Sequence, residues 1–368
     1  MSASLFDFIP PFCPRTRCRY HHCAEGWKWN HHGSYVRDCP PYVIPRFRCG
    51  HCGSTFSTQT FSPTYYLKRP DLQERLFHRL VACSCYRQIA RELLCSHSTL
   101  MRQAARLGRH SLLVMAEALE QLALAAVSEP LVIDGFESFA YSQYHPLHLH
   151  LVIGSKSHFT YGFTHSRLRR KGTMTAPQRR RRERIEERHG RPDPKAIEID
   201  MAAAIRMAVP APQPLLVHSD EHPAYPRSFR RLAGLDITHH TTHSSVPRTL
   251  WNKMHPCNRM DNLLRHSGSN HKRETIASSK RHQCVIERAA VHLAWCNFSK
   301  RYSENHDTDT PAMKLGLAKT PLNPAAILGH RRFPSRIKLP EPWKEYYRRG
   351  IDTPGIANPV RHRLKRAY

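Results

Sequence analysis

Residues 131–136 read Leu-Val-Ile-Asp-Gly-Phe, a short apolar run that contains one carboxylate, Asp134. Before this run, apolar residues recur at the three- and four-residue spacing of helices, and after it they gather in the short segments typical of strands. Residues 214–220 read Pro-Leu-Leu-Val-His-Ser-Asp and end in Asp220. The two runs therefore predict two strands, each of which carries an acid near its carboxyl end.

The chain between and after these runs predicts the other elements of a mixed sheet. Strands are predicted at residues 147–153, 158–163 and 236–242, and helices at residues 175–208, 225–232, 258–271 and 283–302. The order β-β-β-α-β-α-β-α-α is that of a ribonuclease-H-like domain of the α+β or α/β class, in which helices flank a mixed sheet. In this order the first and fourth strands are parallel neighbours at the sheet centre, so Asp134 and Asp220 should converge.

Two carboxylates that converge repel each other unless a cation joins them. The divalent ions Mg²⁺ and Mn²⁺ prefer oxygen ligands, so the acid pair predicts a site for one of them. A third acid should come from the helix that packs across the sheet after the fifth strand. Asp261, within Asn-Arg-Met-Asp-Asn-Leu-Leu-Arg at residues 258–265, is the favoured candidate. Its rivals are Glu274 and Glu287.

Six of the twelve cysteines lie in the first 52 residues, and four of these form two closely spaced pairs, Cys13 with Cys18 and Cys49 with Cys52. Two such thiol pairs are what a tetrahedral Zn²⁺ site needs. A mixed Cys/His site is one alternative, with His21, His22, His31, His32 or His51 as a ligand, and a loop of unpaired thiols is another. The spacing favours a structural zinc site with four cysteine ligands.

Residues 70–110 carry the periodicity of three short helices. Leu72, Leu76 and Leu80 lie on one face of the first, residues 84–94 form the second, and Ser96 or Ser98 caps a third that runs to Leu107. Such a trio is typical of a helix-turn-helix, although a plain three-helix bundle has the same spacing. A helix-turn-helix would place one set of side chains near DNA: Arg87, Ser98, Thr99, Arg102, Gln103 and Arg106. An amphipathic connecting helix should follow at residues 111–127.

The 57 Lys and Arg against 29 Asp and Glu give a formal charge of +28, which favours a polyanionic partner such as nucleic acid. Residues 167–191 alone hold 11 Arg and Lys against 3 Glu. This insert is either a solvated helix face or a contact to the phosphate backbone, with Arg179, Arg180, Arg181 and Arg182 at its centre. His218 and His222 flank Asp220 and could orient a phosphate, although packing is the commoner role of a histidine.

No membrane segment is predicted. The longest apolar stretch, residues 112–127, is interrupted by Glu117 and Glu120, whereas a spanning helix needs about 20 apolar residues. The first 20 residues lack the basic and apolar regions of an export signal. We therefore expect a cytoplasmic protein with no membrane partner.

Together these motifs resemble the DDE-class insertion-sequence transposases of bacteria, which combine a zinc ribbon, a helix-turn-helix and a ribonuclease-H-like domain. The resemblance covers residues 13–318, and an Asp stands at position 261 where that class often has Glu. The matching segments are Cys13 to Cys18, Arg-Phe-Arg-Cys-x2-Cys-Gly-x-Thr-Phe-Ser at 46–57, Arg-Gln-Ile-Ala-Arg-x-Leu at 87–93, Ser-Asp-Glu-x2-Ala-Tyr at 219–225, Asn-Arg-Met-Asp-Asn-Leu-Leu-Arg-His at 258–266, Arg-Glu-Thr-Ile-Ala at 273–277, and Thr-Pro-Ala-Met-x-Leu-Gly-Leu at 310–317.

The resemblance implies a transposase that binds double-stranded DNA at transposon ends and at the target, and that cleaves and joins it with Mg²⁺ or Mn²⁺ at Asp134, Asp220 and Asp261. It also implies homo-oligomers during synapsis and a nucleoid-associated location. A non-catalytic DNA-binding regulator and a structure-selective nuclease are the alternatives. The expected divisions are a zinc ribbon at 1–66, a helix-turn-helix with connecting helix at 67–128, a catalytic domain at 129–320 with the basic insert near 165–195, and a basic tail at 321–368.

Overall fold

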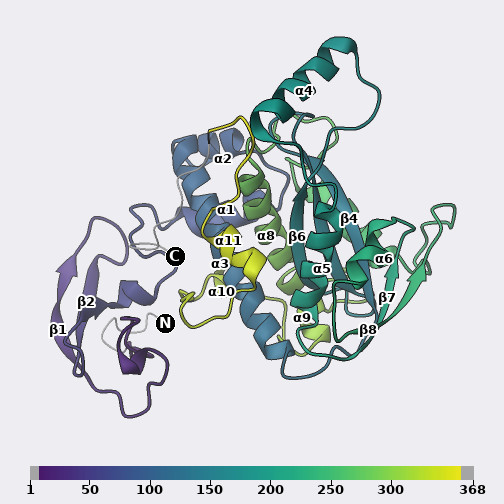
Figure 1. The fold of residues 1–368 in the computed structure, drawn as a ribbon. Coiled ribbons are helices and arrows are strands. Elements are labelled where there is room, and N and C mark those ends of the chain that lie inside the picture. The colour runs from purple at the N-terminus through teal and green to yellow at the C-terminus, as the bar shows by residue number, and fades with distance from the viewer. Residues whose placement is uncertain (1–7, 358–368) are drawn as a thin grey trace.

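The computed structural model describes residues 8–357. Its amino-terminal part is a small antiparallel sheet in the order β1-β2-β3, formed by β1 (Trp29–Val36), β2 (Val43–Cys49) and β3 (Thr55–Ser57). Two short 3-10 helices, η1 (Arg19–His21) and η2 (Thr58–Phe61), flank it. This unit, which we call the cysteine module (residues 8–62), lies at one side of the molecule (Figure 1).

Three helices follow, and the third is longer than expected. They are α1 (Leu72–Leu80), α2 (Tyr86–Glu92) and α3 (His97–Leu122). Ser96 caps α3 by accepting a hydrogen bond from the Thr99 amide, as predicted. The predicted break near Leu107 is wrong, because α3 continues through Gly108 as one helix of 26 residues. A Cβ at Gly108 would lie 2.7 Å from Glu287 Cβ, so the glycine serves close helix packing and not chain reversal.

A five-stranded mixed sheet forms the larger part of the molecule. Its strands are β4 (Leu131–Phe139), β5 (Pro146–Gly154), β6 (Thr160–Arg167), β7 (Pro214–Ser219) and β8 (Asp236–Thr241), in the order β6-β5-β4-β7-β8. The first three strands form an antiparallel meander, and β7 and β8 are parallel to β4. The prediction that the first and fourth strands of this sheet are parallel neighbours is confirmed.

Helices cover both faces of this sheet. The even and odd positions of β4 face different cores: Val132 and Phe136 pack with α7 (His255–Ser267) and α8 (His282–Phe298), and Leu131 and Ile133 pack with α5 (Ala196–Ala208). The short helix α6 (Ala224–Phe229) follows β7. The basic helix α4 (Ala176–His189) has no buried residue and projects from the sheet as an arm (Figure 1).

The carboxyl-terminal segment is part of the fold up to residue 357, so the predicted tail is wrong for the described residues. It contains α9 (Pro311–Lys314), α10 (Pro324–Ile327) and α11 (Glu341–Tyr347). Trp343 on α11 is fully buried, and its indole nitrogen donates a hydrogen bond to the Phe163 carbonyl of β6 at 2.9 Å. The sequence prediction did not identify this buried helix, because basic residues outnumber the aromatic ones in the segment.

The boundary predicted at residue 128 does not separate two cores. Apolar side chains of α1, α2 and α3 belong to the same buried cluster as Leu131 and Ile133 of β4. The helices are therefore packed as one layer of a larger core, and α3 lies directly against α8 (Figure 1).

Within residues 8–357, no helix has the length and apolarity that a membrane crossing requires. The longest helix, α3, carries Glu117 and Glu120 near its carboxyl end, as the sequence indicated. The prediction about an export signal concerns residues 1–20, of which residues 1–7 lie outside the described part of the chain.

The burial of Trp343 can be tested against an exposed tryptophan. Replacing Trp343 with Ala removes a buried ring and should lower the free energy of unfolding by roughly 3–5 kcal/mol. Trp251 is 90% exposed, so Trp251→Ala should change it by less than about 0.5 kcal/mol. Urea denaturation of the two variants measures both values. Equal stability of the two variants would contradict the packing of the carboxyl-terminal segment.

Candidate functional site

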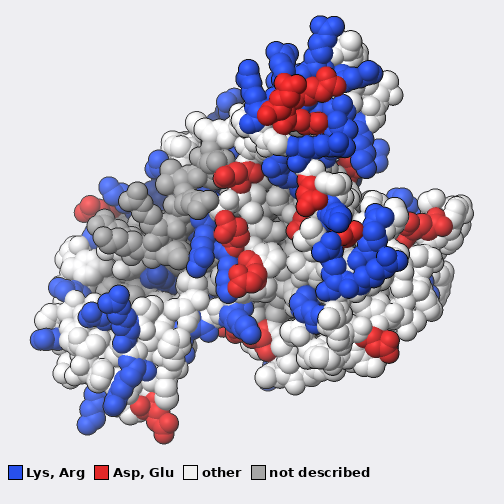
Figure 2. Space-filling model, viewed as in Figure 1, with Lys and Arg blue, Asp and Glu red and all other residues white. Residues whose placement is uncertain are grey.

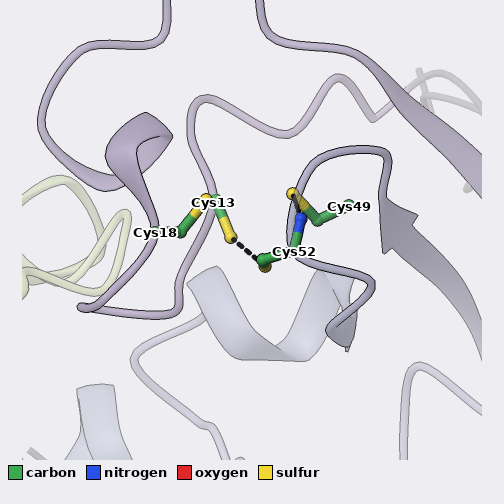
Figure 3. Close-up of side chains that lie close together, drawn as sticks. All are labelled: Cys13, Cys18, Cys49 and Cys52. Carbon is green, nitrogen blue, oxygen red and sulfur yellow. Dashed lines mark hydrogen bonds between the residues drawn. The ribbon is translucent and has the colours of Figure 1, made fainter.

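Four cysteines converge in the cysteine module. Cys13 and Cys18 lie on the loop that leads into η1, whereas Cys49 ends β2 and Cys52 lies in the following turn (Figure 3). All four sulfur atoms lie within 4.8 Å of one another, and the Cys13 and Cys52 sulfurs are 3.7 Å apart. A tetrahedral Zn²⁺ with Zn–S bonds of about 2.3 Å would hold its sulfurs about 3.8 Å apart. The cluster could therefore hold a metal ion such as zinc, as the spacing predicted.

The surroundings of the cluster act differently on its thiols: burial raises the pKa of Cys13 and of Cys18, whereas the pKa of Cys52 is lowered. The Trp27 indole nitrogen donates to Cys49 Sγ at 3.2 Å, and the Cys52 amide lies 3.5 Å from the same sulfur. Burial by itself would raise the pKa of Cys52, but hydrogen bonds from Ser54 and from the neighbouring thiols outweigh it and bring this pKa to about 6. Gly53, at φ +68°, allows the tight turn after Cys52. Metals bind the deprotonated thiol, so the low pKa of Cys52 suits ligation, and a bound cation would offset the effect of burial on Cys13 and Cys18.

The histidines proposed as alternative ligands are not part of the cluster. Both ring nitrogens of His21 are already engaged, Nδ1 with the Cys13 carbonyl and Nε2 with the Ser335 hydroxyl. His51 Nδ1 lies 3.6 Å from Cys18 Sγ, at the rim of the site. Among residues 8–357, the four thiols are the one group of three or more Cys, His, Asp or Glu ligand atoms with this close spacing.

Zinc binding can be tested with one cluster cysteine and one free cysteine. The chain should bind about one Zn²⁺, and Cys52→Ser should lose it because one of four ligands is removed. Cys23 is exposed and outside the cluster, so Cys23→Ser should retain the ion. Elemental analysis after dialysis gives the stoichiometry, and thermal melting gives the effect on stability. Retention of full zinc by Cys52→Ser would refute the assignment.

Two carboxylates lie at the same level of neighbouring strands. Val132 of β4 pairs with His218 of β7, and Asp134 and Asp220 follow these two residues by two positions each. Asp134 Oδ1 accepts a hydrogen bond from the Gly135 amide at 2.7 Å and one from the Tyr225 hydroxyl at 3.4 Å. Burial raises the pKa of Asp134 to about 6, and the charge of Asp220 adds to this effect. The two acids therefore interact, as the strand order predicted.

Helix α7 brings a third acid to this pair. Cys257 Sγ lies 3.5 Å from the Val132 carbonyl, which holds the start of α7 against β4. Asp261 follows one turn later, and burial together with the charge of Asp134 raises its pKa to about 7. Its Oδ1 atom is buried and has no hydrogen-bond partner within residues 8–357. Asp134 thus interacts with both Asp220 and Asp261, and Asp261 Oδ1 is an oxygen that could bind a ligand.

The rival third acids lie elsewhere. Glu287 on α8 is buried and forms an ion pair with Arg349 at 2.7 Å. Glu274 is exposed in the loop after α7. Of the three candidates, Asp261 is the one whose pKa is raised by Asp134.

The two histidines beside Asp220 have different surroundings. His218 is buried, and its Nδ1 atom has no hydrogen-bond partner among the described residues. His222 Nδ1 accepts from the Ala224 amide at 3.2 Å, and its own backbone amide donates to Asp220 Oδ1 at 2.9 Å. Burial lowers the pKa of both rings, which favours their neutral forms. A role in orienting phosphate stays a prediction.

Two of the predicted DNA-contacting residues are not on the surface. Gln103 is buried and hydrogen-bonds Gln73, and Arg106 is buried and donates to the Pro63 and Tyr65 carbonyls at 2.9 and 2.8 Å. The prediction that these two contact DNA is wrong for this conformation, because their polar groups are used inside the protein. The other four lie at the surface: Arg87, Ser98 and Arg102 are exposed and Thr99 is half-buried.

The basic arm α4 presents its charge to solvent. Arg179, Arg180 and Arg181 are exposed, and Figure 2 shows a dense group of Lys and Arg on the projecting arm. Arg182 is half-buried and lies near Glu186 at 3.5 Å. Glu186 also pairs with Arg169 at 2.8 Å, which ties the arm to the end of the sheet. Arg181 lies over the Tyr144 ring.

The site thus offers buried carboxylate oxygens at the acids, and the arm offers exposed positive charge. No known family model and no curated protein matches the chain. The resemblance to transposases therefore rests on the quoted motifs alone.

Proposed function

We propose that the chain is a transposase that cleaves and joins DNA by metal-dependent phosphoryl transfer at Asp134, Asp220 and Asp261. One observation carries this proposal: two acids lie at one level of parallel neighbouring strands, and α7 adds a third acid to them. The strand order β6-β5-β4-β7-β8 agrees with the ribonuclease-H-like fold that such enzymes have.

The acid site fits a hard divalent cation. Burial and mutual repulsion disfavour the ionised forms of Asp134 and Asp261, and a cation would relieve both. The unpartnered Oδ1 atom of Asp261 supplies a free ligand oxygen. When bound, Mg²⁺ or Mn²⁺ would activate the attacking oxygen and stabilise the leaving one.

The residues around the acids would position DNA. The charges of Arg248, in the loop before α7, and Arg265, on α7, both lower the pKa of Asp261. A guanidinium group binds phosphate through several N–H donors. The exposed arginines of α4 extend the positive surface beyond the site, so the acids would hold cations while the arginines hold phosphate oxygens.

The proposal predicts that each acid is essential for chemistry. Asp134→Asn, Asp220→Asn and Asp261→Asn should each lower strand transfer at least about 100-fold with Mg²⁺, because each removes a ligand charge. Asp200, a largely buried acid on α5 that accepts from Ser166, provides the control, and Asp200→Asn should keep activity. A strand-transfer assay with donor ends measures the rates.

The outcomes separate the proposal from its alternatives. Full activity in all three variants would refute the acid site. Binding of donor DNA without cleavage by the wild type would favour a non-catalytic regulator. Cleavage of branched DNA with no need for donor ends would favour a structure-selective nuclease.

A further inference from the structure

A groove lies between the cysteine module and the carboxyl-terminal segment, remote from the three acids. It has a volume of about 660 Å³. One wall comes from the loops that carry the thiols, with Arg15 and Thr16 between Cys13 and Cys18, and Ser54 after Cys52. The other wall is residues 331–348. We call it the basic trough, after the five cations that line it: Arg15, Arg331, Lys338, Lys344 and Arg348.

Both walls of the basic trough are held in place by hydrogen bonds and aromatic packing. The Arg15 guanidinium donates to Ser54 Oγ at 3.0 Å, which joins the two cysteine loops. On the other wall, the Arg331 amide donates to the Phe61 carbonyl at 2.7 Å. The Phe333 ring packs edge-on against Phe12, with ring centres 5.1 Å apart. The trough is therefore preorganised, and its shape depends on the cysteine cluster.

The acids next to the basic trough lie outside its lining: Glu120 accepts a hydrogen bond from the Lys338 amide, and Glu341 pairs with Lys344. No Asp or Glu is among its described lining residues. Lys338 and Arg348 are exposed and form no ion pair within residues 8–357. Cations gathered along a groove repel one another unless an anion enters, and the groove is too large and open for one phosphate ion. A chain of phosphates matches its charge.

A second hollow continues the basic trough. It has a volume of about 740 Å³ and shares Thr55, Phe56, Thr60 and Tyr65 with the trough. Its lining adds three cations, Arg37, Arg46 and Lys68, against one acid, Asp38. The two hollows therefore adjoin and together form a positive surface larger than either one.

We propose that the basic trough binds the phosphodiester backbone of double-stranded DNA. The choice of DNA as the anion rests on the proposed function, but the surface is separate from the acid site. Figure 1 shows the cysteine module and the five-stranded sheet on opposite sides of α3 and α8. The chain would therefore hold duplex DNA at a place that neither the acids nor α4 provides, and the carboxyl-terminal segment would take part in binding.

The test compares two pairs of charge removals in the full-length chain. Lys338→Gln with Arg348→Gln removes two trough cations. Arg301→Gln with Lys319→Gln removes two exposed cations that follow α8 and lie outside the trough. Fluorescence anisotropy with a 30-base-pair duplex of arbitrary sequence, without added Mg²⁺, gives affinity across a salt series. The trough pair should weaken binding about tenfold and reduce the salt slope by about 2, since each phosphate contact contributes about 0.9.

Further variants make each outcome decisive. The charge-retaining pair Lys338→Arg with Arg348→Lys should bind as the wild type, and circular dichroism checks that all variants fold. Unchanged affinity and slope in the Gln trough pair would overturn the proposal, as would an equal loss in the control pair. If the trough pair loses binding of polyglutamate but not of duplex, the partner is an acidic protein and the proposal is wrong. Asp134→Asn should bind duplex as the wild type does. The proposal of DNA binding in the trough is therefore tested separately from the proposal of catalysis at the acids.

Discussion

The parallel pairing of β4 with β7 is the constraint on which the larger part of the molecule depends. It brings Asp134 and Asp220 to one level at the centre of the sheet, where burial disfavours the charged form of Asp134. Protein interiors tolerate such a pair when cations or hydrogen bonds compensate it. Gly135, Tyr225 and the charge of Arg248 provide part of that compensation for Asp134.

The carboxyl-terminal segment connects the sheet with the cysteine module. Trp343 enters the core beside Phe163, and Phe333 packs with the aromatic rings of the module about ten residues earlier in the chain. His21 and Ser335 add a hydrogen bond of 2.7 Å between the two parts. A metal ion held by the four cysteines would therefore stabilise this segment as well as the module.

The sequence predicted elements correctly where a pattern repeats over neighbouring residues. It did not predict the role of polar groups whose hydrogen-bond partners lie far away in the sequence. Strand periodicity located β4 and β7, and thiol spacing located the cluster. The third helix was predicted to end at Leu107, because the sequence does not show that Gly108 packs against Glu287, far along the chain. Arg106 was expected to contact DNA because its partners, two carbonyls near residue 64, cannot be identified from spacing.

The local sequence was therefore enough to predict that the four thiols form a cluster and that the two strand acids lie close together. These features depend on neighbours within a few residues or on composition, and the amino-acid order specifies both. Packing decided that Asp261, and not Glu274 or Glu287, joins Asp134, and that residues 331–348 form one wall of a groove. Such choices depend on which side chains meet after the chain has folded back over tens to hundreds of residues, where burial and charge act through space.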